Sequence, residues 1–595
     1  MAAAALVSTR TVMATYEVNM ALSKIAEVKC DDRGYRSLVA LTSLKPGVDV
    51  LIERPIAVIA VGDAAAIGKG LKEASQGPYV SLEDEALNHI DAISAETGCD
   101  VKLLRLIIKV ASWYVIRSQK AESGLSTDVE SESITATSRA FDLLCEGPDV
   151  KDTAESDPLY TAMKMLSEKI AFPEWINDEK EKISHLLRIS YKINSNSYGI
   201  VNPNFEGTSD ILGVGLFPVV GLSVNHSCNP NLYFSWNSEC GFMQYRSMKE
   251  ISPGDEISVA YCDVFNDTIT RRKELFKTRC FECTCCKCAS FITFYNALRE
   301  SISRGEKGAF LPSVSSNASD DLLDLLIDDL CDDVTSARLG NGKGPKVCKQ
   351  KKNKPAQKTS AVGSSGGNTE SRSHTGGAAL VTQELLADLN LVGYNCLKCA
   401  DGGISLLVDD KATKCLSCGH LERDVLLSSY VAINDRFLAV KNNPTNSTLV
   451  EAFLREYDPL YASTYGTLKK AETLFEQRRD KKLQGRLKLH KSNKLIVQAL
   501  VFHAINLRSG LPESKLLKPS EATIRILVAL VQRICENYEA VLSPNHPLVA
   551  NMKMDVAEDL LRLGGDGPGS ATQLRAEALR IYKVSLGKEH AKNKL

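Results

Sequence analysis

The spacing of apolar residues divides the chain into strand-like and helix-like parts. Residues 20–62 hold short apolar runs on both sides of Pro46 and Gly47, a dipeptide typical of a tight turn. Similar runs return over residues 192–263, whereas residues 63 to about 190 have the longer spacing of amphipathic helices. The pattern therefore predicts a multidomain α+β protein in which a helical insertion divides a β-rich unit.

The carboxy-terminal part has a different spacing of apolar residues. From about residue 426 onward, successive segments each carry one apolar face at helical spacing. Antiparallel helix pairs of the tetratricopeptide (TPR) type fit this pattern, although the sequence shows no fixed repeat period. We therefore expect an all-α, TPR-like domain at this end.

The region between these two parts is polar. Residues 319–334 combine leucines near helical spacing with seven aspartates. This is typical of a solvated amphipathic helix or, alternatively, of an acidic partner-binding motif. The lysine-rich stretch that follows has almost no core-forming residues, so it predicts a disordered linker whose lysines could also serve nuclear import.

Composition excludes some classes of protein. A chain of 595 residues is too long for one core, and its net charge of -1 argues against direct nucleic-acid binding. The most apolar run, residues 101–118, carries Lys102, Arg105 and Lys109 at helical spacing and predicts an amphipathic core helix instead of a membrane span. The first twenty residues lack the charged start and continuous apolar centre of a signal peptide. We expect a cytoplasmic or nuclear protein, or one found in both, with no membrane contact.

A first cluster of cysteines has the spacing of zinc ligands. It supplies three closely spaced thiolates, from Cys283, Cys285 and Cys288. A tetrahedral zinc site needs four ligands. Cys280 and Cys286 are local candidates for the fourth, and Cys228, which enters our predicted ligand set, lies further upstream. If the Cys228 thiolate binds the same zinc ion, that ion would join the carboxy-terminal end of the β-rich unit to the segment around Cys228.

A second cluster is a pair of Cys-x-x-Cys motifs, formed by Cys396, Cys399, Cys415 and Cys418. This spacing is a strong signal for a zinc ribbon in a reducing compartment. His420 is a spare candidate ligand that we interpret as a bystander. Because sites closed by four thiolates are structural, we expect about two structural zinc ions and no zinc-dependent hydrolysis.

One run of polar residues needs an explanation. Asn225, His226, Cys228 and Asn229 directly follow an apolar stretch that should be buried. Buried polar groups are costly unless each finds a partner. The sequence therefore predicts that this run meets a ligand, a metal or another part of the chain.

These motifs together resemble the SET-domain lysine methyltransferases. The segments that carry the likeness are "DDRGYRSLVALTSLKPGVDVLIERP", "NHSCNPN", "GDEISVAY" and "CFECTCCKC". They look most like the subfamily in which a MYND zinc finger splits the SET domain and a helical carboxy-terminal domain follows. The match covers roughly residues 20–62 and 185–290 and, more loosely, 426–595.

The resemblance implies a domain layout in seven parts. These are the amino-terminal part of the SET domain (20–62), a helical insertion at the MYND position (63–184), the SET core (185–263), a post-SET zinc site (264–290), an acidic helix and disordered linker (291–385), a zinc-ribbon-like module (386–425) and the TPR-like domain (426–595).

It also implies the site residues of a methyltransferase that uses S-adenosylmethionine. Asn225 and His226 would hold the methionine part and the ribose of the cofactor, with Phe281 packing on its adenine. Tyr261 would be the catalytic tyrosine and would also contact the cofactor. The remaining cofactor contacts would come from Arg33, Gly34 and Asn196.

The sequence departs from the family at two places. Residues 63–190 contain only Cys99 and Cys145, too few for a MYND finger, and Arg279 stands where the family often has a second tyrosine. The expected function is a protein-lysine N-methyltransferase acting on histone or non-histone lysines. The alternative is a catalytically weak SET scaffold or adaptor in transcription or signalling, with co-repressors or chaperones as candidate partners of the helical domain.

Overall fold

The structure is a computed structural model. It describes residues 25–30, 35–60, 86–122, 137, 140–144, 146, 153–170, 172, 176–201, 211–237, 241–304, 383–396, 398–399, 404–408, 411–413, 415–416, 418, 420, 423–461, 488–510, 520–563 and 568–588. The predicted acidic segment 319–334 and the linker after it lie outside the described residues, as do Arg33 and Gly34.

The β-rich unit consists of three small sheets around one apolar core. The first sheet has the order β1 (Ala26–Cys30), β2 (Arg36–Ala40), β10 (Glu256–Val259) and β7 (Asn225–His226). The second has the order β3 (Asp49–Glu53), β9 (Phe242–Ser247) and β8 (Leu232–Asn237), and the third β4 (Ala57–Ala60), β6 (Ile211–Leu216) and β5 (Ser197–Val201). The predicted turn precedes β3, where Gly47 has a φ of 91° that disfavours other residues.

A helical insertion separates the amino-terminal strands from the rest of this unit, as the spacing of apolar residues predicts. Its helices are α6 (Ile90–Thr97), α7 (Val101–Glu122), α9 (Pro158–Ser167) and α10 (Glu179–Asn196). The buried face of α7 packs against β4, so the insertion shares the core of the sheets. The strand expected from residue 192 begins only at Ser197, because the apolar face of α10 continues through Ile193 into that core.

Four helices surround the end of the β-rich unit. They are α11 (Pro218–Ser223), α12 (Thr268–Arg279), α13 (Cys286–Ser303) and α15 (Gln383–Val392). The segment predicted as acidic helix and linker, residues 291–385, therefore begins and ends within packed helices. The reason is an apolar contact in which Phe291 and Phe294 of α13 share a buried cluster with Leu389 of α15.

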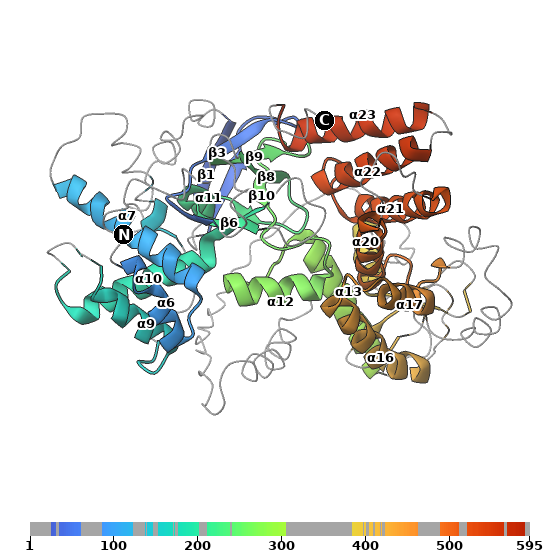
Figure 1. Cartoon of the computed structure of the whole chain (residues 1–595), viewed down its shortest axis with the longest axis horizontal. Coiled ribbons are helices and arrows are strands. Elements are labelled where there is room, and N and C mark those ends of the chain that lie inside the picture. Colours follow the sequence, from blue (N-terminus) through green and yellow to red (C-terminus); the bar gives the residue numbers. More distant parts are fainter. Residues whose placement is uncertain are drawn as a thin grey trace, which may run out of the picture.

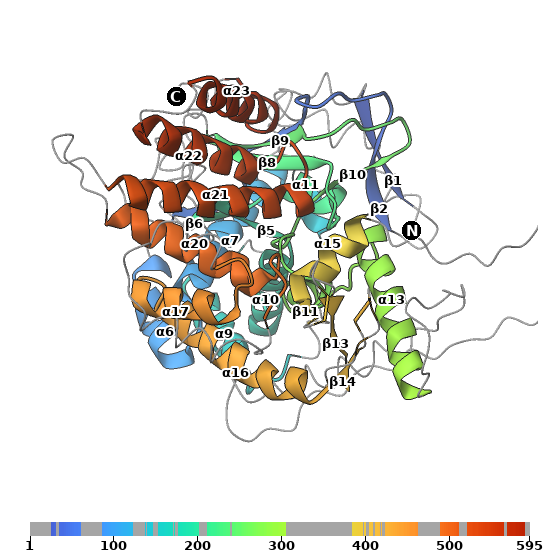
Figure 2. The ribbon, with the colours of Figure 1, turned by 90° about the vertical axis from the view of Figure 1, so that its right-hand side faces the viewer.

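The remaining elements are a small β module and a row of helices. The module holds two strand pairs, β11 (Tyr394–Asn395) with β12 (Ile404–Ser405) and β13 (Leu407–Val408) with β14 (Lys411–Ala412). Each helix of the row packs on the next, in the order α16 (Arg423–Asn442), α17 (Ser447–Tyr457), α20 (Lys494–Ser509), α21 (Glu521–Val541), α22 (Pro547–Leu563) and α23 (Pro568–Ser585) (Figure 2). The all-α end is confirmed, and its TPR-like repeat stays a prediction.

The sheets lie between the helical insertion and the carboxy-terminal helices (Figure 1). Polar contacts fasten the last helices to β9 and its following turn: the Arg246 Nε donates to the Val584 carbonyl at 3.0 Å, and the Asn545 amide donates to the Met248 carbonyl at 2.6 Å. Within the described part of the chain, every helix is too short or too polar to cross a bilayer.

Candidate active site and cysteine-rich centre

The polar run that begins at Asn225 lies along β10. Strand β7 pairs with β10 in parallel, with Asn225 opposite Ser258 and His226 opposite Val259. The Ser227 N–H then donates to the Val259 carbonyl at 2.9 Å. This pairing brings the start of the run next to Tyr261, which lies two residues after the end of β10.

Each polar side chain of the run finds a partner within the chain. The Asn225 amide donates to the Arg36 carbonyl at 2.6 Å and to the Glu256 carboxylate at 2.8 Å. The Asn229 amide donates to the Glu384 carboxylate at 2.9 Å, so this loop also contacts α15. Glu256 stands within the quoted segment "GDEISVAY", but only the fold brings its carboxylate to Asn225.

His226 uses both of its ring nitrogens inside the protein. Its Nδ1 accepts the backbone N–H of Tyr261 at 2.9 Å, so the proton of the neutral ring is on Nε2, which lies 3.2 Å from the Cys228 sulfur. Burial lowers the pKa of His226 to about 4, which keeps the ring neutral. The imidazole therefore connects the segment after β10 with the cysteine cluster. Because both ring nitrogens have partners, His226 would contact a ligand through its backbone groups.

Aromatic rings gather around Tyr261. Its ring centroid lies 5.9 Å from that of Tyr198, 5.5 Å from that of His226 and 6.3 Å from that of Phe281. The Tyr261 hydroxyl donates to the Val224 carbonyl. Burial raises the pKa values of both Tyr198 and Tyr261, so both phenols are neutral at physiological pH. Tyr198 stands two residues after the predicted Asn196, but only the fold brings its ring to Tyr261.

Arg279, the departure from the family pattern, points into this aromatic group. Its guanidinium carbon lies 5.5 Å from the Tyr198 ring centroid and 5.2 Å from the Tyr261 ring centroid. The guanidinium donates to the backbone carbonyls of Ser195 and Ser197. The residue ends α12, and Cys280, in the left-handed conformation with φ 58°, turns the chain away after it.

The first cysteine cluster assembles four sulfur atoms within 4.8 Å of one another, from Cys228, Cys283, Cys285 and Cys288. Cys280 and Cys286, the local alternatives, are exposed and lie outside the group. The fold thus brings Cys228 to the cysteine trio, as the predicted ligand set requires. Four cysteine sulfurs in one group are the donor set that structural zinc takes in proteins.

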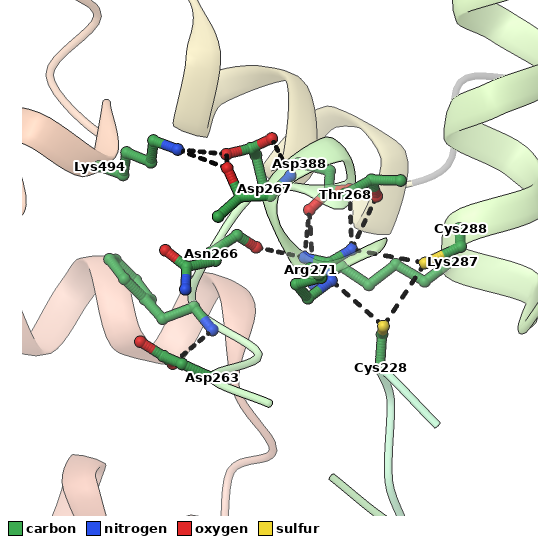
Figure 3. A network of polar contacts seen from close by, with 12 residues as sticks. Cys228, Asp263, Asn266, Asp267, Thr268, Arg271, Lys287, Cys288, Asp388 and Lys494 are labelled. Carbon is green, nitrogen blue, oxygen red and sulfur yellow. Dashed lines mark hydrogen bonds and ion pairs between the residues drawn. The ribbon is translucent and has the colours of Figure 1, made fainter. Parts of the chain in front are cut away.

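The surroundings of this cluster fit a centre of negative charge. Arg271 of α12 is fully buried, and its Nε lies 3.2 Å from the Cys228 sulfur (Figure 3). Its guanidinium donates to both oxygens of the fully buried Asp388, at 3.0 and 3.1 Å, and the buried Lys287 amine lies 3.7 Å from that carboxylate. Two buried cations thus face one buried anion, and four thiolates around a zinc ion would supply the missing negative charge.

Two effects act in opposite directions on the charge of Arg271. Burial by itself lowers the pKa of the guanidinium, but the Asp388 carboxylate raises it above its ordinary value, so the side chain stays cationic. The Thr268 hydroxyl accepts from Arg271 at 2.7 Å, which leaves few of its donors unsatisfied. Neither Arg271 nor Asp388 was predicted, because each resembles an ordinary surface residue in its local sequence.

The second cluster brings together the four cysteines of the paired motifs. The Cys396 and Cys418 sulfurs lie 3.6 Å apart, and those of Cys399 and Cys415 lie 3.7 Å apart. His420 is outside the group, and its backbone carbonyl accepts the Cys415 N–H at 2.7 Å. This donor set also fits structural zinc, and its place in the β module agrees with the predicted ribbon.

Two further predicted residues have defined positions. Asn196 is buried at the end of α10, where its amide donates to the Lys192 carbonyl at 2.8 Å and its side chain packs against Gly221. Phe281 is half-buried beside His226, with the ring centroids 6.1 Å apart. Only Phe281 of these two borders the aromatic group around Tyr261.

Comparisons with known proteins agree with this geometry. Residues 83–262 match the family model of the SET domain. A SET and MYND domain-containing protein of Dictyostelium discoideum is 34% identical over 121 residues, which are 19% of this chain and 35% of that protein. The histone-lysine N-methyltransferase SMYD3 of Mus musculus is 36% identical over 97 residues, 16% of this chain and 21% of that protein.

A plant relative gives a similar result. The histone-lysine N-methyltransferase ASHR1 of Arabidopsis thaliana is 37% identical over 79 residues, 13% of this chain and 16% of that protein. The chain thus spans between about a sixth and about a third of the length of these relatives.

Proposed function

We propose that this chain, which carries a SET domain of the SET-and-MYND type, transfers methyl groups from S-adenosylmethionine to lysine side chains of proteins, histones or others. The observation that carries the proposal is the parallel pairing of the polar run with β10. It brings His226 together with Tyr261 and Phe281, next to the first cysteine cluster.

The cofactor supplies a methyl group that is already activated on a sulfonium sulfur, so the protein has to align and desolvate an amine. Tyr261 suits this task. Because its hydroxyl proton is given to the Val224 carbonyl, the phenol oxygen is left as an acceptor for an N–H of the amine. The raised pKa keeps Tyr261 neutral, so it orients the amine without taking its proton.

The remaining roles follow from the same arrangement. Asn225 is held by Arg36 and Glu256, which fixes its backbone groups for the methionine part of the cofactor, and Phe281 offers a flat apolar face for an adenine. The cysteine cluster positions the segment that carries Phe281 and takes no part in the transfer, since four thiolates leave no open coordination position. We place the protein in the cytoplasm, the nucleus or both, with its substrates among proteins there.

Tyr261→Phe tests the proposal. We expect this variant to transfer methyl groups at least about 100-fold more slowly than the wild type, because the acceptor that aligns the amine is lost. The measurement is radiolabelled methyl transfer to peptide arrays. Calorimetric titration with S-adenosylmethionine should show that the variant still binds the cofactor.

The matched control is Tyr430→Phe, which removes the hydroxyl of an exposed tyrosine on α16 and should leave transfer unchanged. A wild-type chain that binds no S-adenosylmethionine, or a Tyr261→Phe variant as active as the control, would contradict the proposed function.

One observation favours the alternative, a SET scaffold with weak activity. The Arg279 guanidinium lies over the rings of Tyr198 and Tyr261, where it would face the substrate amine. A fixed cation at this place disfavours a second cation beside it. The role of Arg279 therefore decides between an enzyme of full activity and a scaffold.

A further inference from the structure

Arg279 lies in surroundings that are suited to binding a cation. Two tyrosine rings, inclined at 86° to each other, present their π systems to its guanidinium. Two backbone carbonyl oxygens, of Ser195 and Ser197, accept its N–H groups. Aromatic faces together with carbonyl acceptors form a cage for an organic cation that carries N–H or N–CH₃ groups. We call these four groups the tyrosine–carbonyl cage.

A purely structural role for Arg279 accounts for part of this. Ser195 lies in the last turn of α10, and a cation at the carboxyl end of a helix is favourable because it satisfies free carbonyls and faces the negative end of the dipole. That role explains the contacts to the carbonyls. It does not require the guanidinium to lie over Tyr261, whose hydroxyl faces the proposed amine site.

From this geometry we infer that Arg279 is a specificity-determining residue that fills the tyrosine–carbonyl cage in place of an external alkylammonium ion. The inference rests on the proposed function only for the identity of that ion, a lysine or methyllysine side chain. The chain supplies the cage with its own cation, tethered at the end of α12 and therefore present at high effective concentration.

Two consequences follow for a lysine side chain that enters the proposed amine site beside Tyr261. The protonated amine is disfavoured by the like charge of Arg279, so the site admits the neutral, nucleophilic form in preference. A methylated lysine, which is again a cation, is also disfavoured. Arg279 thus selects against binding of the charged product and against any reader function of the cage.

The test measures binding of n-butyltrimethylammonium, an analogue of the trimethyllysine side chain, to the full chain by calorimetry. Arg279→Met removes the charge, Arg279→Gln removes it but keeps an N–H donor for the carbonyls, and Arg279→Lys keeps it. We expect both uncharged variants to bind the probe at least about tenfold more tightly than the wild type and Arg279→Lys. Arg525→Met, an exposed arginine of α21, is the matched control and should bind like the wild type.

Each outcome decides the inference. A gain for either uncharged variant, if that variant unfolds at the wild-type temperature, supports it. If every uncharged variant that unfolds at the wild-type temperature binds the probe no more tightly than the wild type and Arg525→Met do, the inference is overturned and Arg279 remains a cap of α10. The assay needs neither cofactor nor turnover, so it is independent of the proposed function. If neither the wild type nor any variant transfers methyl groups but an uncharged variant gains affinity for the probe, the proposed function is wrong and the inference about Arg279 holds. If methyl transfer is normal but no uncharged variant gains affinity, the proposed function holds and the inference about Arg279 is wrong.

Discussion

Cys228→Ser should release about one zinc ion per chain and weaken the binding of S-adenosylmethionine. Cys228 belongs to the polar run that begins at Asn225, and the cysteine trio lies just before α13 and in its first turn, so one metal ion bound there would hold both segments. Loss of a direct ligand should lower zinc affinity by more than the roughly 10- to 100-fold that changes to ligand-supporting residues cost. Zinc is measured by mass spectrometry of the purified protein, and cofactor binding by calorimetry.

Two other cysteines serve as controls for this prediction. Cys286→Ser alters an exposed cysteine of the same segment, outside the sulfur group, and should keep the full zinc content. Cys415→Ser should release zinc from the second cluster but spare cofactor binding, because that cluster lies in the separate β module. Equal zinc contents for Cys228→Ser and Cys286→Ser would show that the proposed ligand set is wrong.

Arg271→Met should destabilise the protein by about 3–5 kcal/mol, the usual cost of leaving one buried charge without its partner. The group left without its main partner would be Asp388, which is fully buried and, among the described residues, keeps Lys287 as a cation 3.7 Å away. Asp388→Asn should lower the free energy of unfolding by a similar amount, because it leaves the buried Arg271 cation without its partner. The measurement is the midpoint of urea unfolding, followed by a signal from the β-rich unit.

The double variant Arg271→Met/Asp388→Asn separates the ion pair from its surroundings. If the two residues act as a pair, the double variant should lose less stability than the sum of the single variants. Arg525→Met breaks an exposed pair with Glu521 and should change stability by at most about 0.5 kcal/mol. Strict additivity, or a loss at Arg271 no larger than at Arg525, would contradict a coupled buried pair.

The features that could be predicted from the sequence depend on local spacing. The turn at Gly47, the helical insertion and the two cysteine groups all have signatures that span few residues. Spacing alone left Cys280, Cys286 and Cys228 open as the fourth ligand of the first cluster, and Cys228 entered the predicted set although 55 residues separate it from Cys283. These cases share one physical cause, since turn geometry and metal coordination restrict which residue types fit.

The features that were missed depend on contacts between distant segments. Arg271 lies in a helix rich in lysine and arginine, so nothing in its own pattern shows that it is buried against Asp388, 117 residues further along the chain. The inward direction of Arg279 depends on where α10 ends, and we expected a strand there. The internal use of both His226 nitrogens likewise follows from the register of β7 on β10.

The buried pair of Arg271 with Asp388 has a practical consequence. The two residues stand on opposite sides of residues 305–382, and α13 and α15 share an apolar contact across the same interval. We therefore expect two separately expressed polypeptides, one from each side of the interval, to associate through this interface.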